Sequence, residues 1–145
     1  MAPALRLLAQ SVDDVAVISA LVQDAAVLPA EVAFDPRARR LVLLMNRYRW
    51  EEKRPAPTRV RAALRIEGVL KAQRRDWPAE AAATAAIPHV LDLLAVTVEP
   101  GADEAAALAL TFAGGPAIRL EVECLDLVLE DLTDPWIARV TPAHD

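Results

Sequence analysis

The chain has 145 residues, of which 54% are hydrophobic and 26% are charged, and its formal net charge is −5 at pH 7. This length and composition predict one globular domain and exclude a disordered chain, a collagen and a coiled coil. The single cysteine, Cys124, excludes an intramolecular disulfide and, with only two histidines, a closed zinc site.

The charges are distributed unevenly along the chain. Residues 1–36 contain one arginine and five acidic residues, whereas residues 37–75 contain thirteen lysines and arginines and three acidic residues. Residues 76–145 contain two arginines and thirteen acidic residues. The modest net charge therefore conceals a basic middle and an acidic end, and a functional prediction depends on where the two meet.

The N-terminal segment predicts a short strand over residues 4–9 and a helix over residues 11–26. Ser11 can cap this helix by accepting from the amide of Asp14, whose carboxylate can reach back. Apolar residues recur at helical spacing, so the helix is expected to lie flat on a sheet. The segment lacks the charged head and apolar core of a secretory signal, and no apolar stretch matches a membrane span. We therefore expect a soluble cytoplasmic protein.

The middle of the chain predicts strands. Residues 27–34 and 40–50 are apolar runs separated by a turn, which is typical of a β-hairpin, and two prolines predict a loop over residues 51–57. Residues 58–75 alternate strictly between apolar and charged side chains, which predicts the clearest strand of the chain. Gly68 interrupts this pattern and predicts a bulge or a bend.

Three further strands are predicted over residues 89–99, 106–113 and 117–132. Two glycines and a proline between the last two predict a tight hairpin. The apolar phase changes near Cys124, which predicts a bulge or bend there, with the thiol facing the inside of the sheet.

These elements predict an α+β fold in one domain, residues 1–145. About seven mostly antiparallel strands are expected to form a curved sheet or a partly closed barrel, with one N-terminal helix packed on it. Residues 77–88 predict either a short helix or an excursion, and residues 133–145 predict an irregular C-terminal tail.

The sequence contains no motif of a known catalytic site. Its only serines, Ser11 and Ser19, fall in the predicted helix, and neither His89 nor His144 has an orienting partner, which argues against a nucleophilic hydrolase. Cys124 is expected on an apolar face, where a thiol is inert. Glutamates alternating on a strand lie about 6.7 Å apart, too far to share a metal ion without help. We expect no catalytic residue, metal or cofactor; a small enzyme with an unrecognised site is kept as an alternative.

One basic surface is the strongest candidate for binding. Arginines of two neighbouring predicted strands, with one tryptophan at the edge, could form a platform for RNA or single-stranded nucleic acid. Alternatively, these arginines pair with Glu67, Glu121 and Glu123 on neighbouring strands. The scarcity of aromatic residues favours pairing, followed by a site for a protein or a small anionic ligand. The candidates are Arg47, Arg49, Trp50, Arg59, Arg61 and Arg65.

Several strings, including DDVAVISALVQDA, NRYRWE, RVRAALRIEGVLK and FAGGPAIRLEVECLDLVLEDLTDPW, resemble an alphaproteobacterial family, the domain of unknown function 2948. The resemblance covers nearly the whole chain and implies no activity, cofactor or site residue. We therefore predict a small cytosolic non-enzymatic binding or accessory protein that uses a sheet face to contact a protein or a small anionic ligand. An RNA-binding module using the basic residues 37–75 is the alternative.

Overall fold

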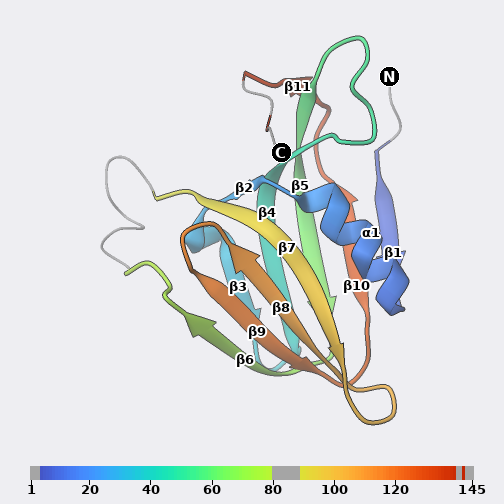
Figure 1. The fold of residues 1–145 in the computed structure, drawn as a ribbon, viewed down its shortest axis with the longest axis vertical. Helices are drawn as coiled ribbons and strands as arrows, with labels where there is room; N and C mark the ends of the chain where they lie inside the picture. Colours follow the sequence, from blue (N-terminus) through green and yellow to red (C-terminus); the bar gives the residue numbers. More distant parts are fainter. Residues whose placement is uncertain (1–3, 80–88, 140–141, 143–145) are drawn as a thin grey trace.

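The computed structural model describes residues 4–79, 89–139 and 142 and places them in one helix and one eleven-stranded sheet (Figure 1). The helix is α1 (Val12–Val22), and a single 3₁₀ turn spans Pro29–Glu31. No helix in this described part is long and apolar enough to cross a membrane. The strands are β1 (Arg6–Ala9), β2 (Ala25–Val27), β3 (Val32–Asp35), β4 (Arg40–Tyr48), β5 (Thr58–Glu67), β6 (Val69–Arg75), β7 (Leu91–Pro100), β8 (Ala106–Phe112), β9 (Ala117–Val122), β10 (Leu127–Asp131) and β11 (Trp136–Ile137).

The sheet is an open path of antiparallel strands. Its order is β1-β10-β5-β4-β2-β7-β8-β9-β6, with β3 paired to β4 and β11 paired to β5. The path ends at β1 and at β6, so the predicted curved sheet is confirmed and the alternative of a partly closed barrel is wrong.

The chain bends where β5 ends and β6 begins. Only Gly68 separates these strands, although they occupy distant places in the strand order. Its φ of 70° favours glycine, and an added Cβ would lie 3.2 Å from the Glu123 side chain. The predicted bend at Gly68 is therefore confirmed. The alternation of apolar and charged side chains also changes phase here, so that Val69 is buried and Leu70 is 56% exposed.

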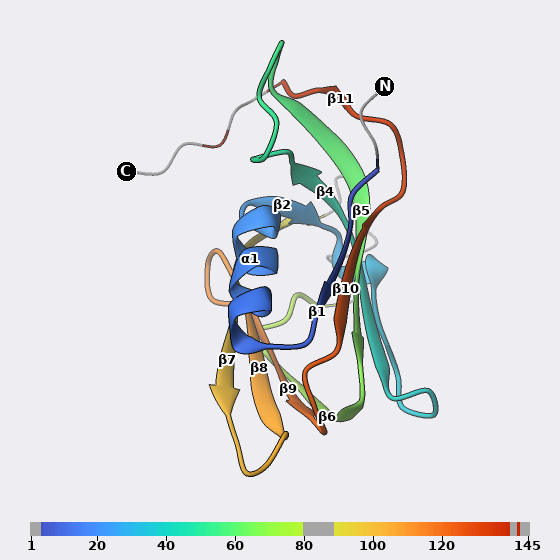
Figure 2. The same ribbon diagram turned by 90° about the vertical axis from the view of Figure 1, so that its right-hand side faces the viewer.

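The hydrophobic core lies between the curved sheet and the helix. Figure 2 shows α1 above β7 and β8 on one side, opposite β1, β10 and β5 on the other. The strand register aligns Leu43, Leu64 and Leu129 across β4, β5 and β10, and all three side chains are fully buried. Ile18 and Val22 of α1 are fully buried as well. The core thus fixes the strands that carry the candidate surfaces.

The predicted helix cap is present. The Ser11 hydroxyl accepts from the amide of Asp14 at 3.1 Å, and the Asp14 carboxylate accepts from the amide of Gln10 at 3.2 Å. The helix ends at Val22, four residues earlier than predicted, because Asp24 adopts a left-handed φ of 61° and the chain continues into β2.

Replacing the capping hydroxyl should destabilise the protein measurably. We expect Ser11→Ala to lower the free energy of unfolding by about 1 kcal/mol, because the Asp14 amide loses its acceptor. Urea unfolding followed by circular dichroism measures this difference. A loss no greater than that of Val17→Ala, on the exposed side of the same helix, would show that the cap contributes little.

The number of strands differs from the sequence prediction of about seven. The additional strands are β2 within the predicted helix, β6 and β10 beyond bends in predicted single strands, and β11 within the predicted irregular tail. Cys124 lies in the break between β9 and β10 and is partly exposed, so its predicted position inside the sheet is wrong. Most of the stretch 77–88, residues 80–88, lies outside the described residues, as does His144.

Candidate functional site

The arginines of β5 lie on the outer face of the sheet, as the period-two pattern predicts, but they are engaged. Arg61 forms an ion pair with Glu31 of the 3₁₀ turn and also donates to Asn46 Oδ1 at 3.3 Å. Arg65 lies 3.0 Å from Glu67, which also accepts from Arg40 at 2.6 Å. Their charges are therefore balanced within the sheet.

Arg59 has a different environment on the same face. Its guanidinium donates to the main-chain oxygens of Asn46 at 3.1 Å and Asp24 at 3.5 Å. It also lies 5.9 Å from the centre of the Tyr48 ring. These hydrogen bonds and the cation–π contact occupy the donors and the face of the guanidinium that would otherwise contact a ligand.

The predicted glutamate partners are only partly correct. Glu67 pairs with Arg65, but both lie on β5, so this pair is not the predicted contact between neighbouring strands. Glu123 pairs with Arg39 at 2.8 Å instead of with an arginine of β5. Glu121 lies opposite Lys71 in the register of β9 and β6, remote from the arginines of β5.

Arg49 and Trp50 lie at the end of β4, where Trp50 is held in place. Its indole Nε1 donates to the carbonyl of Gln23 at 2.9 Å, and its ring packs edge-on against Tyr48 with a centroid distance of 4.6 Å. The Lys53 ammonium lies over the Trp50 ring, 5.5 Å from its centroid. Arg49 donates to the hydroxyl of Thr58 at 3.2 Å. This cluster fastens the loop after β4 rather than presenting a free stacking surface.

Arg47 is the clearest correction to the predicted platform, because its side chain is fully buried. It continues the inward-facing row of β4, opposite Val60 of β5. Its Nε and Nη2 donate to Asp131 at 2.9 and 3.0 Å, and Nη1 and Nη2 donate to Glu51 at 2.9 and 2.7 Å. All of its charge is therefore used inside the protein, and Arg47 cannot share a surface with Arg59.

The cluster of the buried Arg47 and Asp131 with the partly exposed Glu51 shifts two protonation equilibria. Burial disfavours the charge on Arg47, but the hydrogen bonds to Glu51 and Asp131 outweigh it and raise the pKa of Arg47. Burial acts to raise the pKa of Glu51, but the hydrogen bonds from Arg47, a backbone hydrogen bond and the charges of Arg47 and Arg49 together outweigh it and lower that pKa below its ordinary value. The loop carrying Glu51 is thus held to β4 and β10 by charge.

The lowered pKa of Glu51 predicts a specific loss of stability in acid. Its carboxylate stabilises the folded protein at neutral pH, and this contribution disappears as the pH falls through the folded pKa, below 4.5. We expect Glu51→Gln to be less stable than the wild type at pH 7 and the difference to narrow towards pH 3. Urea unfolding at several pH values measures both curves, and a difference that does not change with pH would contradict this assignment.

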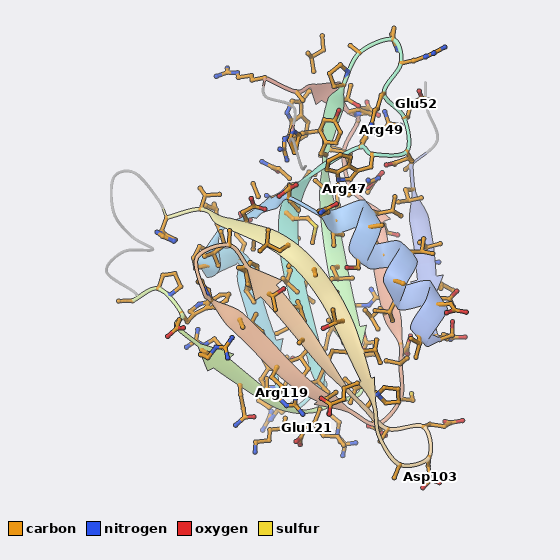
Figure 3. All side chains as sticks on the ribbon, in the orientation of Figure 1. Arg47, Arg49, Glu52, Asp103, Arg119 and Glu121 are labelled. Atoms are coloured by element: carbon orange, nitrogen blue, oxygen red, sulfur yellow. The ribbon has the colours of Figure 1, made fainter. Side chains whose placement is uncertain are left out.

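A different surface collects arginines that are less engaged. On the outer face of β6, β8 and β9 lies a hollow of about 390 Å³. Figure 3 shows Arg119, with Glu121 beside it, at the opposite end of the molecule from Arg47 and Arg49. The side chains that line the hollow are Gln73, Arg74, Arg75, Ala109, Thr111, Ala117 and Arg119.

The strand register explains this hollow. Arg119 pairs with Gln73 of β6 and with Ala109 of β8, so all three project from the same face. Ala117 lies between Arg75 and Thr111 in the next outward row. The small alanine side chains leave space that longer side chains surround.

The hollow is positively charged. Arg119 forms an ion pair with Glu99 at 3.5 Å, and both side chains are more than half exposed, so the pair is weak. Arg75 has no ion pair or hydrogen bond to another side chain in the part of the chain that the structure describes. Arg74 lies 5.6 Å from the centre of the Trp77 ring. Guanidinium groups in such positions suit phosphate or carboxylate oxygens.

A second hollow has no basic side chain in its lining. Cys124 lines this hollow, of about 410 Å³, with Gln10, Glu104, Leu125 and Asp126. Among the described residues there is no group of three histidine, cysteine or acidic side chains that could hold a metal ion.

Sequence reasoning missed the residues of the β6, β8 and β9 face. A signal existed in the pair Arg74–Arg75 at the end of the basic segment, and in Arg119, which alternates with buried residues of β9. However, 46 residues separate Gln73 from Arg119, and only the antiparallel pairing of β6 with β9 brings them together.

The chain matches the model of a family described as protein of unknown function (DUF2948) over residues 5–144, and it belongs to that family. This confirms the family suggested by the sequence strings. No curated protein and no solved structure matches the chain. Family membership assigns no activity, so a functional proposal depends on the geometry of the surfaces described above.

Proposed function

We propose that this family member is a non-enzymatic binding protein that holds anionic groups on the outer face of β6, β8 and β9. The supporting observation is the hollow on this face, where Arg75 and Arg119 line the outer side, while Arg74 contacts the Trp77 ring. The arginines predicted from the sequence are a weaker choice, since Arg61 and Arg65 already pair with glutamates.

The hollow suits a phosphate or carboxylate group. Two guanidinium groups can each donate two parallel hydrogen bonds to such an anion, and the Thr111 hydroxyl and Gln73 amide provide further donors at the rim. A site with this chemistry orients a small anion or an acidic side chain. Among the described residues that line it there is no histidine, cysteine or acidic side chain.

Nucleic acid fits this surface less well. Sequence-tolerant binding of single strands relies on aromatic rings on which bases stack. The Trp77 ring, which Arg74 contacts, packs edge-on against Phe112 at a centroid distance of 5.6 Å and is not free to stack on a base. An acidic protein segment or a small anion is therefore favoured over RNA.

Inorganic phosphate is a suitable probe, because a ligand that binds only the folded state raises the melting temperature. Phosphate replaces chloride at constant ionic strength, which keeps screening of charges fixed. We expect the melting temperature of the wild type to rise with phosphate and that of Arg75→Gln/Arg119→Gln to respond much less.

The control is Arg59→Gln/Arg65→Gln, which removes the same charge from the face predicted by sequence. It should respond to phosphate as the wild type does, and because phosphate stabilises many proteins generally, the comparison between variants decides. Equal responses of the two double variants would contradict the proposed site. Binding of single-stranded RNA that survives Arg75→Gln/Arg119→Gln but not the control variant would support the RNA alternative instead.

A further inference from the structure

The strand next to this hollow, β6, is an edge strand. It pairs with β9 on one side and, within the described residues, with no strand on the other. Its start is fixed, because the Val69 amide donates to the carbonyl of Arg39 at 2.9 Å in the turn between β3 and β4. Edge strands present a row of unpaired backbone groups to which an extended peptide can add.

The two faces of β6 differ in chemistry. Lys71, Gln73 and Arg75 share the outer face with Arg119 of β9. Ala72 and Arg74 share the inner face with Leu120 and Ile118, their register partners on β9. One side of the free edge is thus basic, and the other belongs to the apolar interior.

A cleft of about 240 Å³ lies on the inner side of β6. Its walls are apolar apart from Arg74, and they come from β3, β4, β6 and β9. Phe34 of β3 is 37% exposed here, and β3 pairs only with β4 within the described part of the chain. The lining residues are Val32, Phe34, Leu41, Ala72, Arg74 and Ile118.

We propose that the partner of this site is an extended acidic peptide segment that adds as a strand to the free edge of β6. This inference rests on the proposed anion-binding function and specifies its ligand. Side chains of an added strand alternate between the two faces. Acidic side chains would then lie opposite Lys71, Gln73 and Arg75, and apolar side chains between them would enter the cleft beside Ala72.

Protection against aggregation is the other explanation for a basic edge strand, since lysines and arginines discourage pairing between sheets. That explanation accounts for the charges of β6. It does not account for a cleft with Phe34 in its wall beside the same edge, because protection alone favours a polar surface there. A ligand with alternating acidic and apolar residues matches both faces.

Three fluorescein-labelled seven-residue peptides test this proposal by fluorescence anisotropy. The first alternates glutamate with valine, the second has the same composition with its valines in one block, and the third alternates lysine with valine. We expect the first to bind at least about tenfold more tightly than the other two. Hydrogen exchange should show new protection of backbone amides within residues 69–75 when the first peptide is bound.

One variant separates this proposal from the anion site itself, and a second tests the outer face that the two proposals share. Ala72→Phe fills the cleft without changing the charge. It should weaken binding of the alternating peptide at least about tenfold, whereas phosphate should still raise the melting temperature as in the wild type. Lys71→Gln/Arg75→Gln should weaken binding of the alternating peptide, because its acidic side chains lose their basic partners on the outer face. Melting curves confirm that each variant is folded, and the peptide comparison in the wild type depends on neither variant.

The outcomes distinguish the two proposals. Equal binding of the alternating and block peptides, or no protection in β6, with the phosphate response intact, overturns strand addition and leaves the anion site standing. If the wild type neither binds the alternating peptide nor shows a rise in melting temperature with phosphate, both proposals are overturned. Tighter binding of single-stranded RNA than of the alternating peptide also overturns the peptide as partner.

Discussion

Asp131→Ala is expected to lower the free energy of unfolding by about 3–5 kcal/mol, the usual cost of removing one partner of a buried ion pair. The Asp131 side chain is 5% exposed and accepts two hydrogen bonds from Arg47, which is fully buried. After the substitution, Arg47 keeps Glu51, which is 31% exposed, and a hydrogen bond of 3.5 Å to the main-chain oxygen of Tyr48. The large loss reflects a buried charge left without its partner.

The neighbouring residue provides a matched control. Glu130 pairs with Arg6 at 3.1 Å, but both side chains are about half exposed, so Glu130→Ala should cost about 1 kcal/mol or less. Urea unfolding at pH 7 compares the two variants. Similar losses for Asp131→Ala and Glu130→Ala would show that the buried cluster contributes no more than a surface pair. The double variant Arg47→Met/Asp131→Leu should recover part of the loss, because it removes both charges together.

Leu64→Ala is expected to lower the free energy of unfolding by about 2–5 kcal/mol. Leu64 is fully buried at the centre of the row that joins Leu43 of β4 to Leu129 of β10. Truncation removes its apolar surface from the core and leaves a cavity that three paired strands cannot easily close.

Leu70→Ala is the control for Leu64→Ala, since Leu70 lies beyond Gly68 and is 56% exposed. We expect it to change the free energy of unfolding by about 0.5 kcal/mol or less. Urea unfolding measures both changes. A cost for Leu64→Ala as small as that for Leu70→Ala would contradict the burial of this row.

Local patterns predicted much of the fold. Strict alternation identified β5, the Ser11 cap identified the start of α1, and Gly68 identified the bend. These features depend on neighbouring residues alone. The short strands β2 and β11 depend on pairing with distant partners, β7 and β4 for the first and β5 for the second, and no local pattern predicts them.

Arg47 shows why the predicted binding platform was partly wrong. Arginines at alternate positions of residues 47–49 resemble a solvent-facing row, yet Arg47 extends the buried row of Leu43 and Met45. Its partner Asp131 lies 84 residues further along the chain. Pairing between strands this distant decides whether a charged side chain is buried or exposed.

The candidate anion site could be predicted only in part for the same reason. Arg74 and Arg75 belong to the basic segment that the sequence identifies, but Thr111 and Arg119 come from β8 and β9. The register of three strands assembles the hollow. Sequence reasoning therefore predicted a basic sheet face as the binding surface, but it assigned that surface to β4 and β5 instead of to β6, β8 and β9.

Nuclear magnetic resonance titration of the ¹⁵N-labelled wild type with inorganic phosphate, at constant ionic strength, tests the proposed site most directly. The site predicts that the largest amide shifts cluster in residues 73–75, at Thr111 and in residues 117–119. Shifts concentrated in residues 59–65 of β5, or spread evenly over all basic residues, would contradict it.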